Sequence, residues 1–323
     1  MSRPEEDRSF DVLTMGRVGI DLYPLEEGVT LDRVETFERY LGGSPTNVAV
    51  AAARLGHRAA VITRTGTDPF KAFVHRELRR LGVSDAFVTE AEGTHTTLAF
   101  CEILPPDRFP LTFFRDATPP DLLITADELD LEAIDAAGIF WATLSGLARD
   151  PSRAAHHRAW EARGRRAHTV LDLDLRPSFW RSPAEARHEA RRALERVSVV
   201  VGTLEECALV VDEQTPEQAG GALLRTGVDL AVVKLGPHGV LGMTSQETVV
   251  VPAVRVEVLN GLGAGDGFGG ALCHGLLSGL GLEEMLRFAN AAGAIVATRR
   301  GCSTAMPTRA EVEALLARSA VRA

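Results

Sequence analysis

Residues 260–270 read Asn-Gly-Leu-Gly-Ala-Gly-Asp-Gly-Phe-Gly-Gly, and they carry most of the information about fold and chemistry. The alternating glycines allow the backbone to turn several N–H groups toward one point. An apolar run follows and predicts a helix, whose positive dipole end adds to the field at that point. The segment therefore predicts an anion hole formed by the amides of Gly263, Ala264 and Gly265.

Asp266 lies inside this segment. If a phosphoryl group binds the amides, a carboxylate beside it can take the proton from an attacking hydroxyl group. The plainer interpretation is that Asp266 only caps the helix. Residues 265–270 also match the dinucleotide-binding pattern G-x-G-x-x-G. No strand-turn-helix context near a first βα unit accompanies the match, so an NAD-dependent oxidoreductase is the weaker alternative.

The sequence G-A-G-D at 263–266, together with L-G-G-S-P-T-N-V-A at 41–49, resembles the two signatures of the ribokinase-like (PfkB) carbohydrate kinases. They stand in the expected order, and the resemblance extends over essentially the whole chain. It implies an ATP-dependent kinase of a sugar or sugar-like alcohol, with Asp266 as the base. A nonenzymatic sugar sensor on the same fold is an alternative of another class. The carboxylate of Asp266 counts against the sensor.

The rest of the chain alternates short apolar strands with amphipathic helices, which predicts an α/β fold with a mainly parallel sheet covered on both faces. Helix starts are expected at Ser44-Pro45, with Ser44 as N-cap, at the capping box Ser182–Glu185 and at Thr215-Pro216. Residues of about 17–40 and 94–115 break the alternation and predict a small β-sheet lid. We expect one domain over residues 1–323.

Composition excludes several classes of function. The chain has 323 residues, with 44 acidic against 35 basic side chains and a net charge of −9, which argues against nucleic-acid and anionic-membrane partners. The two lysines, Lys71 and Lys234, do not lie in Gly-Lys-Ser/Thr, so a P-loop NTPase is excluded. No apolar run is long enough for a membrane span and no signal pattern opens the chain. We expect a cytoplasmic protein.

On the substrate side, the resemblance assigns a hydroxyl-binding role to Asp21, the last residue of G-R-V-G-I-D at 16–21. Asn47 carries an amide suited to sugar hydroxyl groups. Gly42 and Gly43 permit close approach of the backbone to a ligand, and they also suit a tight turn into the following helix.

On the nucleotide side, T-L-E-E at 203–206 resembles the family's N-x-x-E, which implies that Glu206 helps to hold Mg²⁺ through water. Two further segments, at 232–239 and 288–293, resemble those that flank the nucleotide. They supply Lys234, Gly236, Gly239 and Asn290. The family commonly has Asp-Thr where this chain has Asn260-Gly261, which leaves a monovalent cation as an open question.

D-L-D-L-R-P-S-F-W at 172–180 resembles D-x-N-x-R-x-x-x-W of family members that act on sugar acids, and Arg176 matches its arginine. Arg115 follows L-T-F-F, with Phe113 where such members often carry tyrosine. Two guanidinium groups suit a carboxylate, although any one of 33 arginines is more often a solvated surface residue. G-R-V-G-I-D-L-Y-P at 16–24, Y-L-G-G-S-P-T-N-V-A at 40–49 and R-D-A-T-P-P-D at 115–121 resemble family members of myo-inositol catabolism, which implies 5-dehydro-2-deoxygluconate as substrate. 2-Keto-3-deoxygluconate is second, and another sugar of the family is a further alternative. Exposed strand edges of the lid also predict a possible homodimer through the lid.

Overall fold

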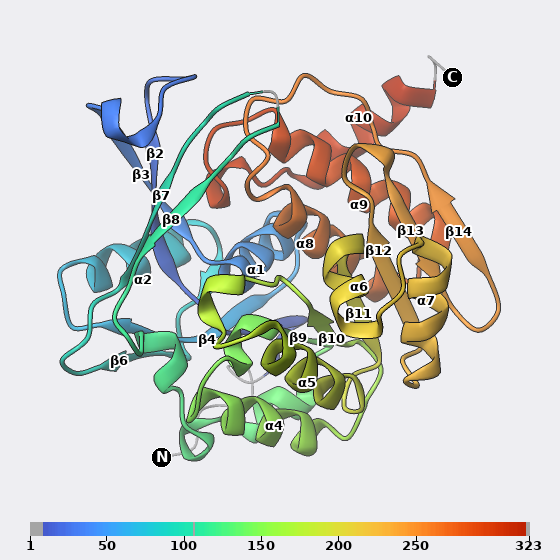
Figure 1. The fold of residues 1–323 in the computed structure, drawn as a ribbon, viewed down its shortest axis with the longest axis horizontal. Coiled ribbons are helices and arrows are strands. Elements are labelled where there is room, and N and C mark those ends of the chain that lie inside the picture. Colours follow the sequence, from blue (N-terminus) through green and yellow to red (C-terminus); the bar gives the residue numbers. More distant parts are fainter. Residues whose placement is uncertain (1–8, 106, 321–323) are drawn as a thin grey trace.

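The computed structural model describes residues 9–105 and 107–320, and its centre is a ten-stranded sheet (Figure 1). Its order is β14-β13-β12-β11-β10-β9-β1-β4-β5, and β6 pairs with β4 beyond the end of β5. The strands are β1 Val12–Met15, β4 Ala59–Gly66, β5 Val83–Ser84, β6 Val88–Ala91, β9 Ile139–Thr143, β10 Thr169–Asp172, β11 Val199–Thr203, β12 Leu230–Lys234, β13 Val240–Met243 and β14 Thr248–Val251. All are parallel except β13 and β14, an antiparallel edge that the sequence pattern did not reveal.

Helices cover both faces of this sheet, as predicted, because successive strand residues point to opposite sides. Along β1, Val12 belongs to one buried apolar cluster and Leu13 to the other. The first cluster is shared with α1 Ser44–Arg54, α2 Phe70–Arg80, α8 Ala264–Leu277, α9 Leu282–Ala297 and α10 Arg309–Ala320. The second is shared with α3 Leu131–Ala136, α4 Ser152–Arg163, α5 Pro183–Leu194, α6 Leu204–Val211 and α7 Pro216–Arg225. No helix within the described ranges is long and apolar enough to cross a bilayer.

The three predicted helix starts are confirmed, although the capping box at Ser182–Glu185 is only half formed, because Glu185 Oε2 accepts from the amide of Arg181 and not from that of Ser182. The hydroxyl groups of Ser182 and Thr215 accept hydrogen bonds from backbone amides in the first turns of α5 and α7. At the first of the three starts only the cap was wrongly predicted, because Gly43 is the N-cap of α1 and Ser44 is the first residue of the helix. Gly43 has φ of 100°, and a β-carbon there would overlap the carbonyl group of Arg17. Ser44 is thereby free to bond a side chain of another helix.

A separate four-stranded sheet forms the lid, in the order β3-β2-β7-β8. Its strands are β2 Gly19–Pro24, β3 Phe37–Gly42, β7 Thr97–Cys101 and β8 Leu111–Phe114. Figure 1 shows this sheet beside α1 and α8, apart from the main sheet. The segment 16–21 belongs to the lid, because it leads into β2, and the first strand of the main sheet, β1, ends before it at Met15. Gly16, with φ of 140°, separates β1 from the lid strand β2.

The architecture brings polar residues to one edge of the main sheet. Asp172, Thr203 and Lys234 are the last residues of β10, β11 and β12, and Thr203 pairs directly with Lys234. Carboxyl ends of parallel strands are where open α/β sheets bind ligands.

The G-x-G-x-x-G match at 265–270 lies within α8, so it is not a strand-to-helix turn. Two of its glycines serve close packing instead. A β-carbon on Gly269 would press on Trp141 at 2.9 Å, and one on Gly270 would overlap Ala51 of α1.

Candidate active site

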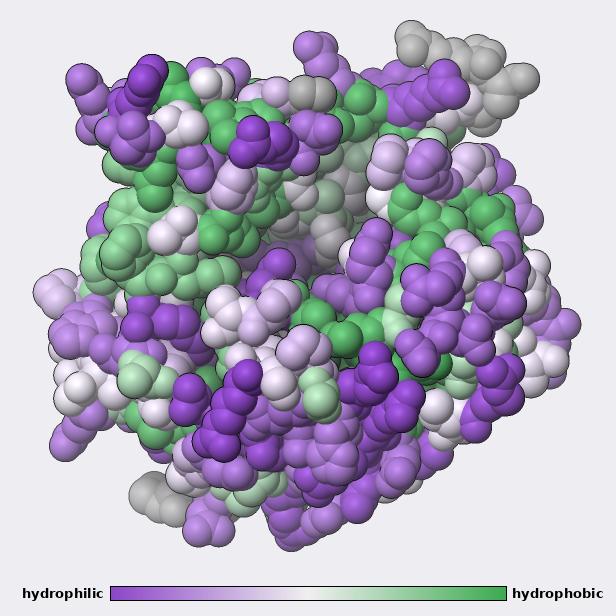
Figure 2. Space-filling view, viewed as in Figure 1, coloured by the Kyte–Doolittle hydropathy of each residue, from purple (hydrophilic) through white to green (hydrophobic). Residues whose placement is uncertain are grey.

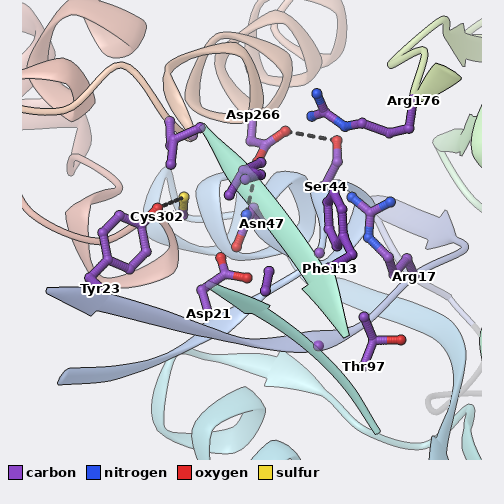
Figure 3. Close-up of a pocket in the computed structure, with 16 residues that line it drawn as sticks. Arg17, Asp21, Tyr23, Ser44, Asn47, Thr97, Phe113, Arg176, Asp266 and Cys302 are labelled. Atoms are coloured by element: carbon purple, nitrogen blue, oxygen red, sulfur yellow. Dashed lines mark hydrogen bonds between the residues drawn. The ribbon is translucent and has the colours of Figure 1, made fainter. Parts of the chain in front are cut away.

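A pocket lies between the inner face of the lid and the first turns of α1 and α8, with about 490 Å³ of empty space (Figure 3). Its lining combines lid residues with polar groups of the main domain: Arg17, Gly19, Asp21, Tyr23, Gly43, Ser44, Asn47, Thr97, Ala99, Leu111, Phe113, Arg176, Leu262, Gly263, Asp266 and Cys302. Segments from both ends of the chain therefore meet in one site.

The carboxylate of Asp266, in the first turn of α8, is held by α1. Ser44 Oγ donates to Asp266 Oδ1 at 2.7 Å, and Asn47 Nδ2 donates to Oδ2 at 2.8 Å. Figure 3 shows both contacts, with Asp266 between α8 and the lid. Because these bonds join it to another helix, capping of α8 does not account for the side chain. Asn47, expected to bind substrate hydroxyl groups, holds Asp266 in this structure.

The environment of Asp266 gives its carboxyl group a higher pKa than that of an aspartate on the surface. Burial and the nearby carboxylate of Asp174 raise its pKa, while the hydrogen bonds from Asn47 and Ser44 and the charge of Arg176 oppose the rise. Hydrogen bonds to the charged form are the part of this balance that one substitution can remove.

We expect Asn47→Ala to raise the pKa of Asp266, because the charged carboxylate loses a donor. A base acts only when deprotonated, so the acid limb of the kcat–pH profile should move to higher pH, with turnover recovering on the alkaline side. Ser44→Ala, which removes the bond to the other oxygen, should move the limb in the same direction. An acid limb that stays in place in both variants would show that the two bonds do not govern this titration.

The predicted anion hole lies at the start of α8. Gly263 is the N-cap, with φ of 80°, and a β-carbon there would press on Cys302 Sγ at 2.8 Å. The amides of Ala264 and Gly265 open the helix, where N–H groups have no partner within it. Lys234 Nζ lies 3.6 Å from the point that a β-carbon on Gly265 would occupy. A cation and a helix N-terminus therefore face the same space.

Lys234 also pairs with Asp172, whose Oδ1 lies 3.6 Å from Nζ. Burial alone would lower the pKa of Lys234, but Asp172 and Glu206 raise it above its ordinary value. Burial raises the pKa of Asp172 to about 7, although Lys234 opposes the rise. The lysine is thus a permanent positive charge at the end of β12.

Glu206 is largely occupied by the protein itself. Its Oε2 accepts from the amide of Thr203 at 2.7 Å, and its Oε1 accepts from the amide of Leu175 at 2.8 Å. The Thr203 hydroxyl group in turn accepts from the amide of Glu206, so the two residues form a capping box. Thr203 stands where the N-x-x-E pattern has asparagine. Each Glu206 oxygen keeps a further acceptor site, so Glu206 can still accept a hydrogen bond from a water molecule bound to Mg²⁺.

Asp21, on β2, lines the pocket from the lid side, and burial raises its pKa to about 7 even though Arg17 acts in the opposite direction. Gly42, on the neighbouring strand, leaves the room for it, because a β-carbon on Gly42 would overlap the Asp21 carboxylate. Gly42 therefore serves the site by leaving space for the Asp21 carboxylate, and Gly43 serves it by allowing the turn into α1.

We expect Gly42→Ala to displace the Asp21 carboxylate and to raise the KM for the phosphoryl acceptor about 10-fold or more, the value of a hydrogen bond to a charged group. The KM for the nucleotide should stay near that of the wild type. Gly281→Ala is the matched control, since a β-carbon there meets no atom within 4 Å. Equal acceptor KM values in the two variants would contradict the assignment of Asp21.

The structure separates the two predicted arginines. Arg176 lines the pocket and pairs with Asp174, its Nη2 lying 2.7 Å from Asp174 Oδ1. Arg115 does not belong to the lining; it pairs with Asp121 at 3.4 Å and stacks on the Phe179 ring at 4.0 Å. The pocket instead contains Arg17, which the sequence motif included but did not single out.

Of the remaining predicted nucleotide residues, Asn290 lines a groove between β14, α9 and α10. Asn290 donates to the carbonyl group of Pro252 at 3.2 Å and is in the groove lining with Val250 and Arg255. Gly239, with φ of 106°, has no room for a β-carbon beside the Val251 carbonyl group. It fixes the hairpin that follows Lys234. Gly236, with φ of 57°, forms the turn before it.

Asn260 is fully buried and stands at the chain position that raised the question of a monovalent cation. Its Oδ1 accepts from the amide of Leu262 at 3.0 Å, and its Nδ2 faces the carbonyl group of Gly301 at 3.5 Å. The amide thus ties two loops together without adding a negative charge.

Comparison with known proteins agrees with this geometry. The model of the pfkB family carbohydrate kinases matches residues 9–309. The chain belongs to this family. Two pfkB relatives are named 5-dehydro-2-deoxygluconokinase: one from Listeria monocytogenes serotype 4b is 32% identical over 97% of this chain and 98% of its own. The other, from Bacillus subtilis, is 31% identical over 96% and 97%.

A solved fructokinase of Vibrio cholerae O395, in a form with bound fructose, ADP and calcium ion, is 26% identical and superposes with a TM-score of 0.82. The likeness covers 95% of this pfkB chain and 99% of the fructokinase. The α/β architecture with a small additional sheet, predicted from the sequence, is thereby confirmed.

Proposed function

We propose that this carbohydrate kinase transfers the terminal phosphoryl group of Mg·ATP to the primary hydroxyl group of a sugar acid, 5-dehydro-2-deoxygluconate. The observation that carries the proposal is a held carboxylate, Asp266, in one pocket with two arginines, Arg17 and Arg176. The names of the relatives support this choice of substrate.

In this mechanism the Asp266 carboxylate takes the proton of the attacking hydroxyl group, and Ser44 and Asn47 keep it oriented. The amides that open α8 and the ammonium group of Lys234 stabilise the charge that develops on the transferred group. Asp21 accepts a hydrogen bond from another hydroxyl group of the acceptor. When bound, Mg²⁺ neutralises phosphate charge and orients the transferred group.

The residues present fit the nucleotide and its metal. The space between α8 and Lys234 suits the phosphates, and the groove with Val250 and Asn290 suits the base and ribose. Across residues 9–105 and 107–320, no group of three His, Cys, Asp or Glu side chains could hold a metal ion. Mg²⁺ would therefore be held mainly by the phosphates and water, as is usual for this ion, with Glu206 in outer contact. We include no monovalent cation, since Asn260 brings no negative charge to this loop and its amide bonds the backbone.

We propose that the main sheet and the lid act as one domain, in which the lid closes over the substrate and excludes water. Phe113 supports this role, because β8 places it in the pocket wall opposite Asp266. The four cysteines are all unpaired and buried, which suits the reducing cytoplasm, where we place the reaction.

The outer face of the lid suits a second copy of the chain. Phe100 packs edge-to-face against both Phe37 and Phe114, with ring centroids 5.3 and 5.2 Å apart, and Phe114 is 57% exposed. Figure 2 shows hydrophobic surface over the region of β2, β3, β7 and β8. We propose a homodimer through this face.

Phe114→Glu should therefore shift the protein from dimer to monomer in light scattering after size-exclusion chromatography. Val250→Glu, at an equally exposed apolar position on β14 far from the lid, is the control and should leave the dimer intact. A monomeric wild type, or a dimer that survives Phe114→Glu, would exclude this interface.

The proposal is tested by coupled ADP release over a panel of acceptors. We expect the highest kcat/KM for 5-dehydro-2-deoxygluconate, with 2-keto-3-deoxygluconate as the nearest competitor and neutral hexoses well below. Activity confined to neutral sugars would exclude the sugar-acid assignment. Absence of ADP release with every acceptor, despite sugar binding, would favour the sugar sensor.

A further inference from the structure

We infer that Arg17, and not Arg115, is the partner of Arg176 in recognising the carboxylate of the acceptor. The inference rests on the proposed sugar-acid substrate and names the residue that gives specificity for it. Arg17 and Arg176 both line the pocket, and Figure 3 shows their guanidinium groups on the side where Ser44 and Phe113 lie.

The position of Arg17 is fixed by its backbone and by two aromatic rings. Thr46 Oγ1 donates to the Arg17 carbonyl oxygen at 3.0 Å, which ties the residue to the first turn of α1. Its guanidinium carbon lies 5.4 Å from the ring centroids of both Phe113 and Phe179. Aromatic faces attract a cation and keep it in place, so the guanidinium group of Arg17 is oriented before the substrate binds.

The charge of Arg17 is compensated only in part, by Asp174 and by Asp21, whose pKa burial raises to about 7 although Arg17 opposes the rise. The Arg17 side chain is 6% exposed, and its nearest carboxylate is Asp174, at 3.8 Å. Asp174 also holds Arg176, at 2.7 Å, so two guanidinium groups share one carboxylate. Within the described residues, Arg17 Nη1 is buried and has no hydrogen-bond partner. A buried cation without a full set of partners is costly, and a ligand carboxylate would supply what is missing.

Arg115 also has a buried Nη1 without a hydrogen-bond partner among the described residues, but it lies outside the pocket lining and has a carboxylate of its own. Its Nη2 contacts both oxygens of Asp121, and its guanidinium group covers the Phe179 ring at 4.0 Å. Arg17 lies near the same ring. Arg115 is therefore a positioning residue, which acts on Arg17 through Phe179.

The test compares 5-dehydro-2-deoxygluconate with its primary amide, which keeps the size but loses the charge. The ratio of kcat/KM for acid over amide is measured in the wild type, Arg17→Met and Arg115→Met. Arg39→Met is the matched control, since Arg39 also stacks on a ring, that of Phe73 at 4.2 Å, but lies outside the pocket.

We expect Arg17→Met to reduce the acid-over-amide ratio about 10- to 100-fold, through the KM for the acid, with the KM for ATP unchanged. Arg39→Met should keep the wild-type ratio. If Arg17→Met does not fold, Arg17→Lys replaces it; the ammonium group lacks the bidentate fork, so the ratio should still fall about 10-fold.

An unchanged ratio in the Arg17 variant would overturn the inference, as would a collapse of the ratio in Arg115→Met alone. A wild-type protein that phosphorylates the amide but not the acid would contradict the proposed function itself, and the inference with it. Because this last result is read from the wild type, the two failures are distinguishable.

Discussion

Asp266→Asn is expected to lose at least about 10²-fold in kcat while the KM values for ATP and acceptor change little, because general-base contributions are of this size. The substitution keeps the volume of the side chain and removes only its ability to take a proton. The variant should fold at least as well as the wild type, since burial and Asp174 both disfavour the charged carboxylate. Single-turnover phosphoryl transfer, measured with enzyme in excess, isolates the chemical step.

The matched control is Thr14→Val, which alters a buried hydroxyl group of β1 outside the pocket lining and should leave turnover near the wild type. A folded Asp266→Asn protein with turnover within a few-fold of the wild type would remove Asp266 from its role as base. The chemistry would then need another proton acceptor.

Lys234→Met is expected to damage both stability and activity. It leaves Asp172, whose side chain is 3% exposed, without its cationic partner, and breaking a buried pair typically costs about 3–5 kcal/mol. The pKa of Asp172, already raised to about 7, should rise further. A carboxyl group with a raised folded-state pKa destabilises the fold only when pH exceeds its unfolded pKa, so the loss in Tm should be larger at about pH 8 than at about pH 5.

A second substitution separates the two effects. Lys234→Met with Asp172→Asn removes the unpaired charge and should recover most of the stability, whereas kcat should stay at least about 10-fold below the wild type, because the cation that faces the first turn of α8 is still missing. Thermal unfolding and ADP release are measured on the same preparations. A stable double variant with wild-type turnover would limit Lys234 to a structural role.

The sequence predicted the layers of the fold because they depend on local patterns. Alternating apolar strands and capped helices can be recognised from the sequence alone, and Ser182 and Thr215 are N-caps as predicted. The wrong cap at Ser44 has a three-dimensional cause: Gly43 takes the N-cap position, and the Ser44 hydroxyl group bonds Asp266, 222 residues away. The edge strands β13 and β14 were missed because they follow β12 without an intervening helix.

Those residues of the candidate site that belong to sequence motifs were predictable. G-A-G-D and the segment at 41–49 indicated Asp266 and Asn47, but no pattern shows that the Asn47 amide bonds the Asp266 carboxylate. Choosing between Arg115 and Arg17 needs the positions of Asp121 and Phe179, which no spacing along the chain provides. One signal was present, since Arg17 stands in the same G-R-V-G-I-D segment as Asp21.

The central claim, phosphoryl transfer to the primary hydroxyl group of a sugar acid, is tested most directly by identifying the product. The protein is incubated with 5-dehydro-2-deoxygluconate and Mg·ATP, and the mixture is followed by phosphorus and proton NMR. The account predicts one phosphate monoester whose phosphorus couples to the terminal methylene protons, formed together with an equal amount of ADP. Release of inorganic phosphate alone, or an ester on a secondary hydroxyl group, would contradict it.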